Sequence, residues 1–411
     1  MTTALTRATT TGVQTQAPSA SAPSVGQRSK RAYLHHVDLI RATTFSLVIF
    51  VHCLTQTTDE FTSLPVNTTS MLLHFTRNTF FALTGFVLMY QNFDKRDFST
   101  FAFWRRRIKL VIFPYVIWSF IYWVVEDMWV HGRLREVPTS LNEFGKLAMW
   151  GLSGFQMYFL FVMLQVYLLF PLVLWLVRAT VGKHKWVLLA SLAAQLAITA
   201  TITYWEPPAS IATYWWHNYA TFIPYQFFIL YGAVAAVHRE EIGRWLSGKL
   251  VAVRRAAGHG RPRLGTYLYG VWYDGKPVHD NNSAFYPALV PFLVVAMTCL
   301  YAVAAHWGEH WREMTPRFAR AVSFASNRSF SVFLCHVLVL FFILYPQMNG
   351  RPAMLVLIGE PWSTFVVYLL TLAGSLLLVE ILRHLPGSLY VTGRPRLPIP
   401  MPWRRNRASQ S

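Results

Sequence analysis

Long uncharged apolar stretches are the feature that most restricts the fold of this chain. Two of them, 157–177 and 285–305, contain no Asp, Glu, Lys or Arg. A helix of about twenty residues spans the roughly 30 Å hydrocarbon core of a bilayer, because each residue adds about 1.5 Å. The chain is 54% hydrophobic and only 13% charged, more apolar than an ordinary soluble enzyme. The pattern predicts an all-α fold, a polytopic transmembrane helix bundle.

We expect about nine to ten spans in this bundle. The tenth would be a crossing or re-entrant segment at 140–155, because nine spans would leave the basic C-terminus outside. The nine are expected at 37–56, 69–91, 109–128, 156–177, 186–204, 219–238, 285–306, 330–347 and 363–382.

Charge placement orients the expected domains. Three basic residues between positions 28 and 31 precede the first span and place the N-terminus in the cytoplasm. Residues 1–32 are rich in Thr, Ser, Ala and Pro, which predicts a disordered cytoplasmic tail. The membrane domain is expected at 33–384, with a basic cytoplasmic insertion at 239–283. Residues 385–411 are expected as a basic C-terminal tail.

The formal net charge of +19 favours membrane topology over nucleic-acid binding. The basic residues lie between apolar stretches, as in cytoplasmic loops, and no nucleic-acid-binding motif is present. We therefore expect no nucleic-acid partner. The three cysteines form no CxxC pair, so the sequence predicts neither a disulfide framework nor a metal site.

The first expected span carries two ionisable side chains, Arg41 and His52. Eleven positions at about 100° each come to about 20° beyond three full turns, so both side chains lie on one stripe, about 16 Å apart. Asp38 shares the lower part of this face and could pair with Arg41. Arg41 lies near the cytoplasmic end, and His52 lies in the outer half.

Two polar groups at two depths on one helical face fit a long substrate. An anionic end would be held by Arg41, and chemistry would occur deeper, where His52 is suited to proton transfer near neutral pH. The alternative is structural: Arg41 would reach the lipid headgroups and His52 would form an interhelical hydrogen bond.

The second expected span, 71–90, adds further polar residues in its outer half, Arg77 and Asn78 among them. Arg77 is expected at a depth comparable with that of His52, where it could stabilise an oxyanion. The alternative is an interhelical structural network. The small pair Thr84–Gly85 allows a close approach of another helix.

The basic cluster WRRRIK at 104–109 lies at the cytoplasmic entry of the third span. Arg105, Arg106 and Arg107 could bind the phosphates of a soluble anionic cofactor. On its own, the cluster is equally typical of positive-inside anchoring, the simpler interpretation.

Five sequence elements occur in an order typical of one family. The first is VDLIRATTFSLVIFVHC, with Asp38, Arg41 and His52, and the second is RNTFFALTGF, with Arg77 and with Thr84 in the place of a serine.

The other three elements follow along the chain. WRRRIKLVIFPYVIWS contains Arg107 and Pro114, QMYFLFVMLQVYLLFPLV has Tyr158 in the place of a tryptophan, and SFSVFLCHV ends near His336, with Phe333 in the place of a tyrosine. From about residue 33 to 384 the chain resembles acyltransferase family 3. These bacterial integral-membrane acyltransferases modify surface glycans, lipids and some glycosylated natural products.

The resemblance implies O-acylation in a bacterial plasma membrane. An acyl thioester, acyl-CoA, would be a co-substrate supplied from the cytoplasm, with no tightly bound cofactor. The acceptor would be a hydroxylated glycan, lipid or small molecule, and His52 would be its general base or a transient acyl carrier. The expected catalytic residues are His52, Arg41 and Arg77; the expected acyl-CoA contacts are Arg41, Arg105, Arg106 and Arg107; the expected substrate-binding residues are Asp38, Asn78 and His336.

Two other function classes remain open. A transporter or flippase for a lipid-linked or glycosylated molecule would line its path with the same buried charges. A catalytically silent scaffold would have no need of both Arg41 and His52. No histidine has an aspartate five residues later, so an acyltransferase of the HxxxxD type is excluded.

Overall fold

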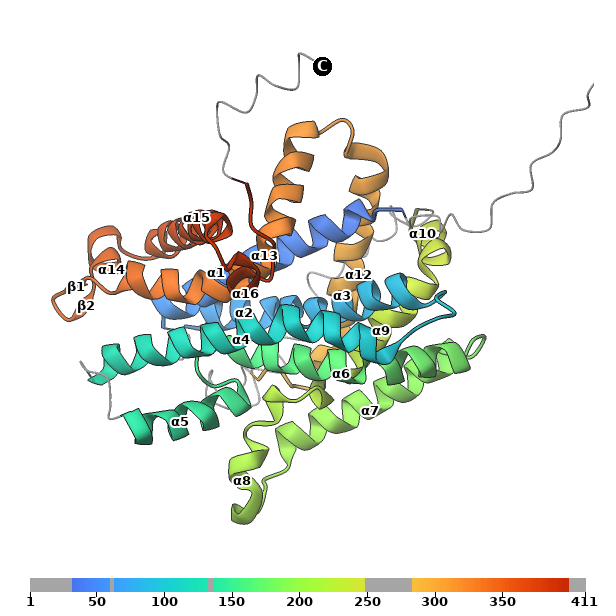
Figure 1. The fold of residues 1–411 in the computed structure, drawn as a ribbon, viewed down its shortest axis with the longest axis horizontal. Coiled ribbons are helices and arrows are strands. Elements are labelled where there is room, and N and C mark those ends of the chain that lie inside the picture. The colour runs from blue at the N-terminus through green and yellow to red at the C-terminus, as the bar shows by residue number, and fades with distance from the viewer. Residues whose placement is uncertain (1–31, 60–62, 132–136, 248–282, 399–411) are drawn as a thin grey trace, which may run out of the picture. The chain divides into compact units, whose positions relative to one another are not determined.

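The computed structural model describes residues 32–59, 63–131, 137–247 and 283–398, and this part of the chain is almost entirely helical (Figure 1). In lipid, helices satisfy every backbone hydrogen bond within one segment, which explains this choice for so apolar a sequence. The main helices are α1 (His35–Thr57), α2 (Leu64–Leu73), α3 (Phe75–Asn92), α4 (Thr100–His131), α5 (Val137–Trp150), α6 (Met157–Ala179), α7 (His184–Tyr204), α8 (Ala209–Trp215), α9 (Gln226–Val237), α10 (Arg239–Ser247), α12 (Leu289–His306), α13 (Pro316–Leu344), α14 (Ala353–Ile358), α15 (Trp362–His384) and α16 (Ser388–Thr392).

Short elements complete the described chain. Two 3₁₀ turns, η1 (Asn218–Ala220) and η2 (Ile223–Tyr225), precede α9, and a π-helical turn, η4 (Trp307–Trp311), follows α12. The strands β1 (Gln347–Met348) and β2 (Arg351–Pro352) form a small antiparallel hairpin after α13. The fold is therefore all-α, as the sequence predicts.

Seven helices in the described residues are long and apolar enough to cross a membrane, and each matches an expected span. The two other expected spans correspond to shorter elements. The segment 69–91 is divided at His74 into α2 and α3, and 219–238 is the apolar helix Ile223–Val237 after an irregular start. The seven are His35–Thr57, Thr100–Glu126, Met157–Ala179, His184–Tyr204, Leu289–Trp311, Pro316–Leu344 and Trp362–His384.

Three features differ from the expected boundaries. Helix α13 begins at Pro316, fourteen residues before the expected start at 330. The segment 140–155 forms most of α5, which has 14 residues and is not among the seven candidate spans. Helix α16, inside the expected C-terminal tail, packs against α4 and α15. The expected tail at 1–32 and insertion at 239–283 lie mostly outside the described residues.

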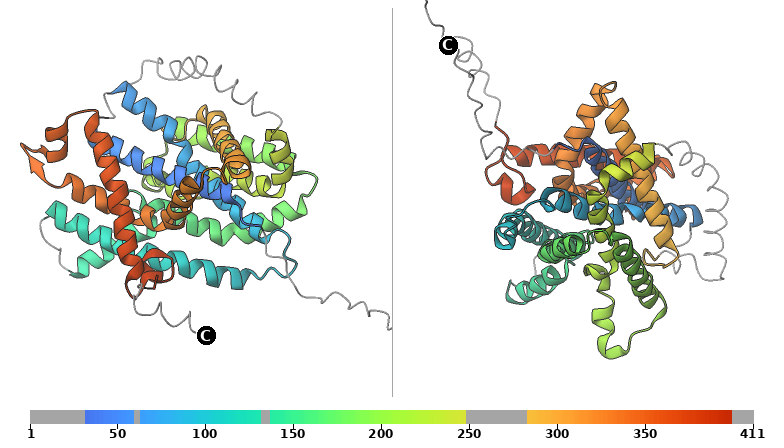
Figure 2. Two further views of the ribbon diagram at one scale, coloured as in Figure 1. Left: turned by 90° about the horizontal axis from the view of Figure 1, so that it is seen from above. Right: turned by 90° about the vertical axis from the view of Figure 1, so that its right-hand side faces the viewer.

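Helix α1 is central to the packing that positions the site. It contacts α13, α15 and α3, and α15 crosses α13 and α1 (Figure 2). Hydroxyl groups join α1 to α15: Ser46 Oγ lies 2.6 Å from the Tyr368 hydroxyl, and Thr57 Oγ1 lies 2.7 Å from Thr364 Oγ1. Such polar contacts hold helices together where lipid provides no hydrophobic driving force.

Helix α3 packs backbone to backbone against α9. A Cβ atom built on Gly85 would lie 2.1 Å from the carbonyl oxygen of Ile229, and one built on Gly232 would lie 1.8 Å from that of Ala82. Both positions therefore require glycine. The close helix approach predicted at Thr84–Gly85 is confirmed, and α9 is the partner.

Candidate active site

A cavity of about 160 Å³ brings together polar side chains from separate parts of the chain. His52 of α1 and Arg77 of α3 both line it, which confirms that they reach a comparable depth. The connection between α5 and α6 contributes Phe155 and Gln156, and the first turn of α6 contributes Tyr158.

The imidazole of His52 is held by ring contacts. Its centroid lies 4.8 Å from that of Phe155 and 5.4 Å from that of His336, with the two imidazoles stacked at 29°. Within the described chain, neither ring nitrogen of His52 forms a hydrogen bond. The packing therefore orients the ring and leaves both nitrogens available to another group.

His336 of α13 is fully buried behind His52. Its Nδ1 donates to the carbonyl oxygen of Phe333 at 2.7 Å, so the neutral ring carries its proton on Nδ1. The Tyr122 hydroxyl of α4 donates to the Leu334 carbonyl at 2.6 Å and accepts from the Leu338 N–H at 3.2 Å. This hydroxyl bridges two groups one turn apart, beside His336, and thereby fixes α13 against α4 at the site.

Arg77 is a cation in an aromatic setting. Its Nη1 donates to the Tyr158 hydroxyl at 3.3 Å, and its guanidinium carbon lies 5.2 Å from the Tyr225 ring centroid and 4.9 Å from that of Phe285. Its Nε and Nη2 are buried and form no hydrogen bond with any described residue. The residues that line the cavity include no Asp or Glu. Two donors of Arg77 are thus directed to no protein acceptor, the arrangement that suits an anionic or partly anionic ligand oxygen.

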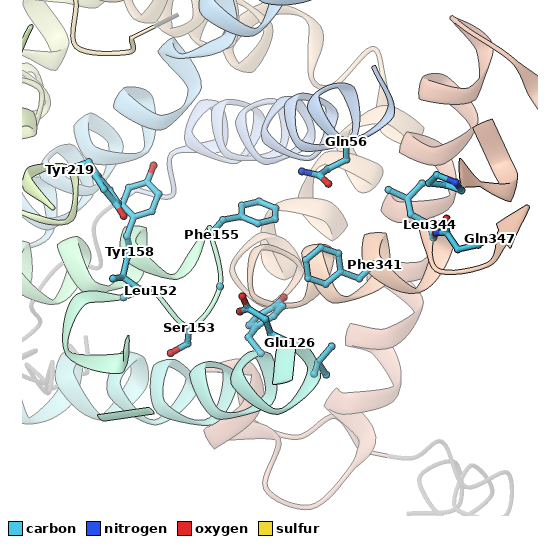
Figure 3. Close-up of a pocket in the computed structure, with 15 residues that line it drawn as sticks. Gln56, Glu126, Leu152, Ser153, Phe155, Tyr158, Tyr219, Phe341, Leu344 and Gln347 are labelled. Carbon is cyan, nitrogen blue, oxygen red and sulfur yellow. The ribbon is translucent and has the colours of Figure 1, made fainter. Parts of the chain in front are cut away.

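A second, larger cavity of about 740 Å³ adjoins the first (Figure 3). Phe155 and Tyr158 line both cavities, so the two are neighbours across these side chains. The larger cavity combines aromatic rings such as Phe341 with polar groups such as Gln56 and Ser153. Aromatic faces beside amides and hydroxyls suit a ligand with both apolar faces and hydroxyl groups.

A second cationic cluster lies toward the start of α1. The guanidinium groups of Arg41 and Arg107 both act electrostatically on Tyr167 of α6, which places them on one side of the bundle. Arg107 also donates from Nη2 to Gln91 Oε1 at 2.6 Å. Arg105 and Arg106, by contrast, are exposed. The structure therefore places Arg107 and Arg41 around one tyrosine and leaves the other two arginines of the loop at the surface.

Two expected substrate-binding residues form hydrogen bonds within the protein. Asp38 is buried and accepts a hydrogen bond from Ser326 Oγ at 2.7 Å, and the described residues show no ion pair between Asp38 and Arg41. The two positions are only about 60° apart around α1, yet Asp38 bonds to α13, whereas Arg41 acts on Tyr167 of α6. Asn78 donates to the His74 carbonyl at 3.3 Å and does not line the cavity, because it lies 100° from Arg77 on the side of α3 away from Thr76, which does line it.

Three contributors to the site were not predicted as functional from the sequence: Tyr122, Phe155 and Gln156. Phe155 and Gln156 lie in a connection between helices, where no helical periodicity assigns a face. The glycines at 151 and 154, just before these two residues, are the one available signal, since glycines often mark a close approach of backbone. Within the described residues, no group of three His, Cys, Asp or Glu side chains is placed to hold a metal ion.

Comparison with known families agrees with the resemblance seen in the sequence. A family model described as an acyltransferase domain matches residues 34–380, nearly the same range as the five sequence elements. No curated protein and no solved structure matches the chain. The family model covers most of the chain, the seven apolar helices make it an integral membrane protein, and the chain therefore belongs to acyltransferase family 3 as a membrane acyltransferase.

Proposed function

We propose that the protein transfers an acyl group from acyl-CoA to a hydroxyl group of a glycan, a glycolipid or a glycosylated small molecule. The observation that carries the proposal is the position of His52. Its ring is oriented by Phe155 and His336, its nitrogens form no hydrogen bond in the described chain, and Arg77 lines the same cavity. This combination supplies a general base and a cation within one cavity.

In the proposed reaction, His52 removes the proton of the acceptor hydroxyl as its oxygen attacks the thioester carbonyl carbon. The C–O bond forms, and the carbonyl oxygen becomes an oxyanion that the unpaired Nε–H and Nη2–H of Arg77 stabilise. When the carbonyl reforms, the C–S bond breaks, and the CoA thiolate receives the proton from the imidazolium of His52. The products are an ester and CoA, with His52 neutral again.

In this proposal the two substrates bind near opposite ends of α1. Arg41 and Arg107 bind the phosphates of acyl-CoA at the cytoplasmic side, and the larger cavity beside Phe155 and Tyr158 receives the acceptor. In this proposal the protein lies in a bacterial plasma membrane, with its N-terminus on the cytoplasmic side. Acyl-CoA is a co-substrate, the acceptor and membrane lipid are the other partners, and no tightly bound cofactor takes part. Asp38, Asn78 and His336 support the site through the contacts described above.

The test is acyl transfer by the purified protein. Radiolabelled acetyl-CoA is offered with a panel of hydroxylated glycans and glycolipids to wild type, to His52→Ala and to His310→Ala, a matched exposed histidine of the π-helical turn. We expect labelled ester and free CoA from wild type and His310→Ala, and at least about a hundredfold less from His52→Ala. Equal rates in all three would remove His52 from the chemistry. Transport of an acceptor across vesicles without any release of CoA would favour the transporter class instead.

A further inference from the structure

Phe155 is the side chain that stands between the two cavities. It lines both of them, and it contacts the catalytic candidate His52 on one side and Phe341, at 6.4 Å between ring centroids, on the other. The side chain is 41% exposed, although it is a large apolar group inside the bundle. Figure 3 shows it between Tyr158 and Gln56, with its ring directed across the larger cavity.

The backbone just before Phe155 is tightly packed. Gly151 has a φ of +69°, and a Cβ atom there would lie 2.6 Å from the Cα of Tyr158. A Cβ atom on Gly154 would lie 3.1 Å from the Tyr122 ring. The connection is therefore seated on the first turn of α6 and on α4, so the position of the Phe155 ring is set by fixed backbone.

Polar groups lie on both sides of the Phe155 ring. Three buried polar atoms near Phe155 form no hydrogen bond of ordinary geometry with the described residues: Ser153 Oγ and the Nε2 and Oε1 atoms of Gln156. Ser153 lines the larger cavity and Gln156 lines the smaller one. A hydroxylated ligand that passes Phe155 would satisfy polar groups on both sides, whereas the ring itself offers no hydrogen bond.

We propose that Phe155 determines which hydroxyl groups reach His52, an inference that rests on the proposed acyl transfer. The ring covers His52 on the side of the larger cavity, so an acceptor must present a slender, unhindered hydroxyl group beside it. The same ring shields the thioester from water. Without it, water attacks the carbonyl carbon, its proton passes through His52 to the departing CoA thiolate, and the products are a free carboxylic acid and CoA.

The experiment measures how the acyl group is divided between acceptor and water. Wild type, Phe155→Ala and Phe155→Leu are compared with Phe342→Ala, a matched control that is 62% exposed and lines neither cavity. Release of CoA, labelled ester and labelled free acid are quantified for an acceptor with a primary hydroxyl and for one with a hindered secondary hydroxyl.

For Phe155→Ala we expect the ratio of hydrolysis to transfer to rise about tenfold or more, and the preference for the primary hydroxyl to fall by a similar factor. Phe155→Leu should lie between this variant and wild type, and Phe342→Ala should match wild type. An unchanged ratio in Phe155→Ala, whether or not total activity falls, would overturn the inference. Absence of CoA release from wild type with every acceptor would instead refute the proposed function, and the inference with it.

Discussion

The crossing of α3 and α9 makes a sharp prediction that is independent of the chemistry. Ordinary van der Waals contact begins at 3.4 Å, whereas a methyl group would lie 2.1 Å from a backbone oxygen at Gly85 and 1.8 Å from one at Gly232. The helices would therefore have to separate by about 1.3 Å in Gly85→Ala and by about 1.6 Å in Gly232→Ala. The obstructing atoms belong to backbone, so no side-chain rotation can relieve the contact.

We expect each substitution to destabilise the protein by about 3 kcal/mol or more, at or above the upper end of the usual cost of overpacking. The effect should extend to activity, because Arg77 lies on α3 about 12 Å from Gly85 along the axis. A misplacement of about 1 Å at a reacting centre can lower the rate about a hundredfold. Thermal unfolding of the detergent-purified protein, followed by intrinsic fluorescence, measures the first effect, and the CoA-release assay measures the second.

A matched control is Gly243→Ala in α10, where an added Cβ atom would meet nothing within 4 Å. This variant should be as stable as wild type or more stable by up to about 1 kcal/mol, since alanine favours the helical backbone. A Gly85→Ala protein that melts with wild type and retains full activity would show that the α3–α9 contact does not position the site.

Three further predictions concern the polar contacts. Arg107→Gln should raise the KM for acyl-CoA about tenfold or more, and exposed Arg105→Gln should change it less than about threefold, both read from initial rates against acyl-CoA concentration. Tyr158→Phe removes the hydroxyl that accepts from Arg77 and should lower kcat about tenfold, with an unchanged KM for acyl-CoA. An equal change in kcat and KM would contradict a positioning role. Ser326→Ala leaves the buried Asp38 carboxylate without this donor and should cost about 1–3 kcal/mol in a thermal unfolding assay, whereas a wild-type melting curve would count against the bond.

Much of the fold could be predicted because the dominant forces act locally along the chain. Bilayer thickness sets the length of an apolar span at about twenty residues, and a helix satisfies its backbone hydrogen bonds within that span. Both requirements can be read from a single stretch of sequence. The spacing of Arg41 and His52 is likewise a property of one helix. Gly85 predicts a close helix contact, but the sequence does not identify α9 as the partner. A comparable depth of His52 and Arg77 could be expected, since two spans in one membrane share a common reference, whereas their place in one cavity also depends on helix rotation.

The remaining features depend on contacts between segments that are distant in sequence. Rotation of one helix about its axis decides that Asp38 faces Ser326 of α13 and that Asn78 turns away from the cavity. No local pattern reports that rotation. The same holds for Phe155, whose place depends on how an irregular connection is seated on two helices. The sequence therefore identified candidate groups, and only the packing distinguished cavity-lining groups from structural ones.

The setting of Arg77 connects these observations. A cation within a membrane protein is costly and is usually paired with a carboxylate. Among the described residues that line its cavity there is no carboxylate, and the guanidinium is stabilised by one hydroxyl group and two aromatic rings. A permanent counterion would satisfy Arg77 in the resting state and leave less stabilisation for charge that develops during reaction. We infer that Arg77 interacts more strongly with the oxyanion formed from a thioester carbonyl than with any group of the resting protein. An interaction that strengthens in the transition state lowers the barrier, whereas one that is equal in the ground state only tightens binding.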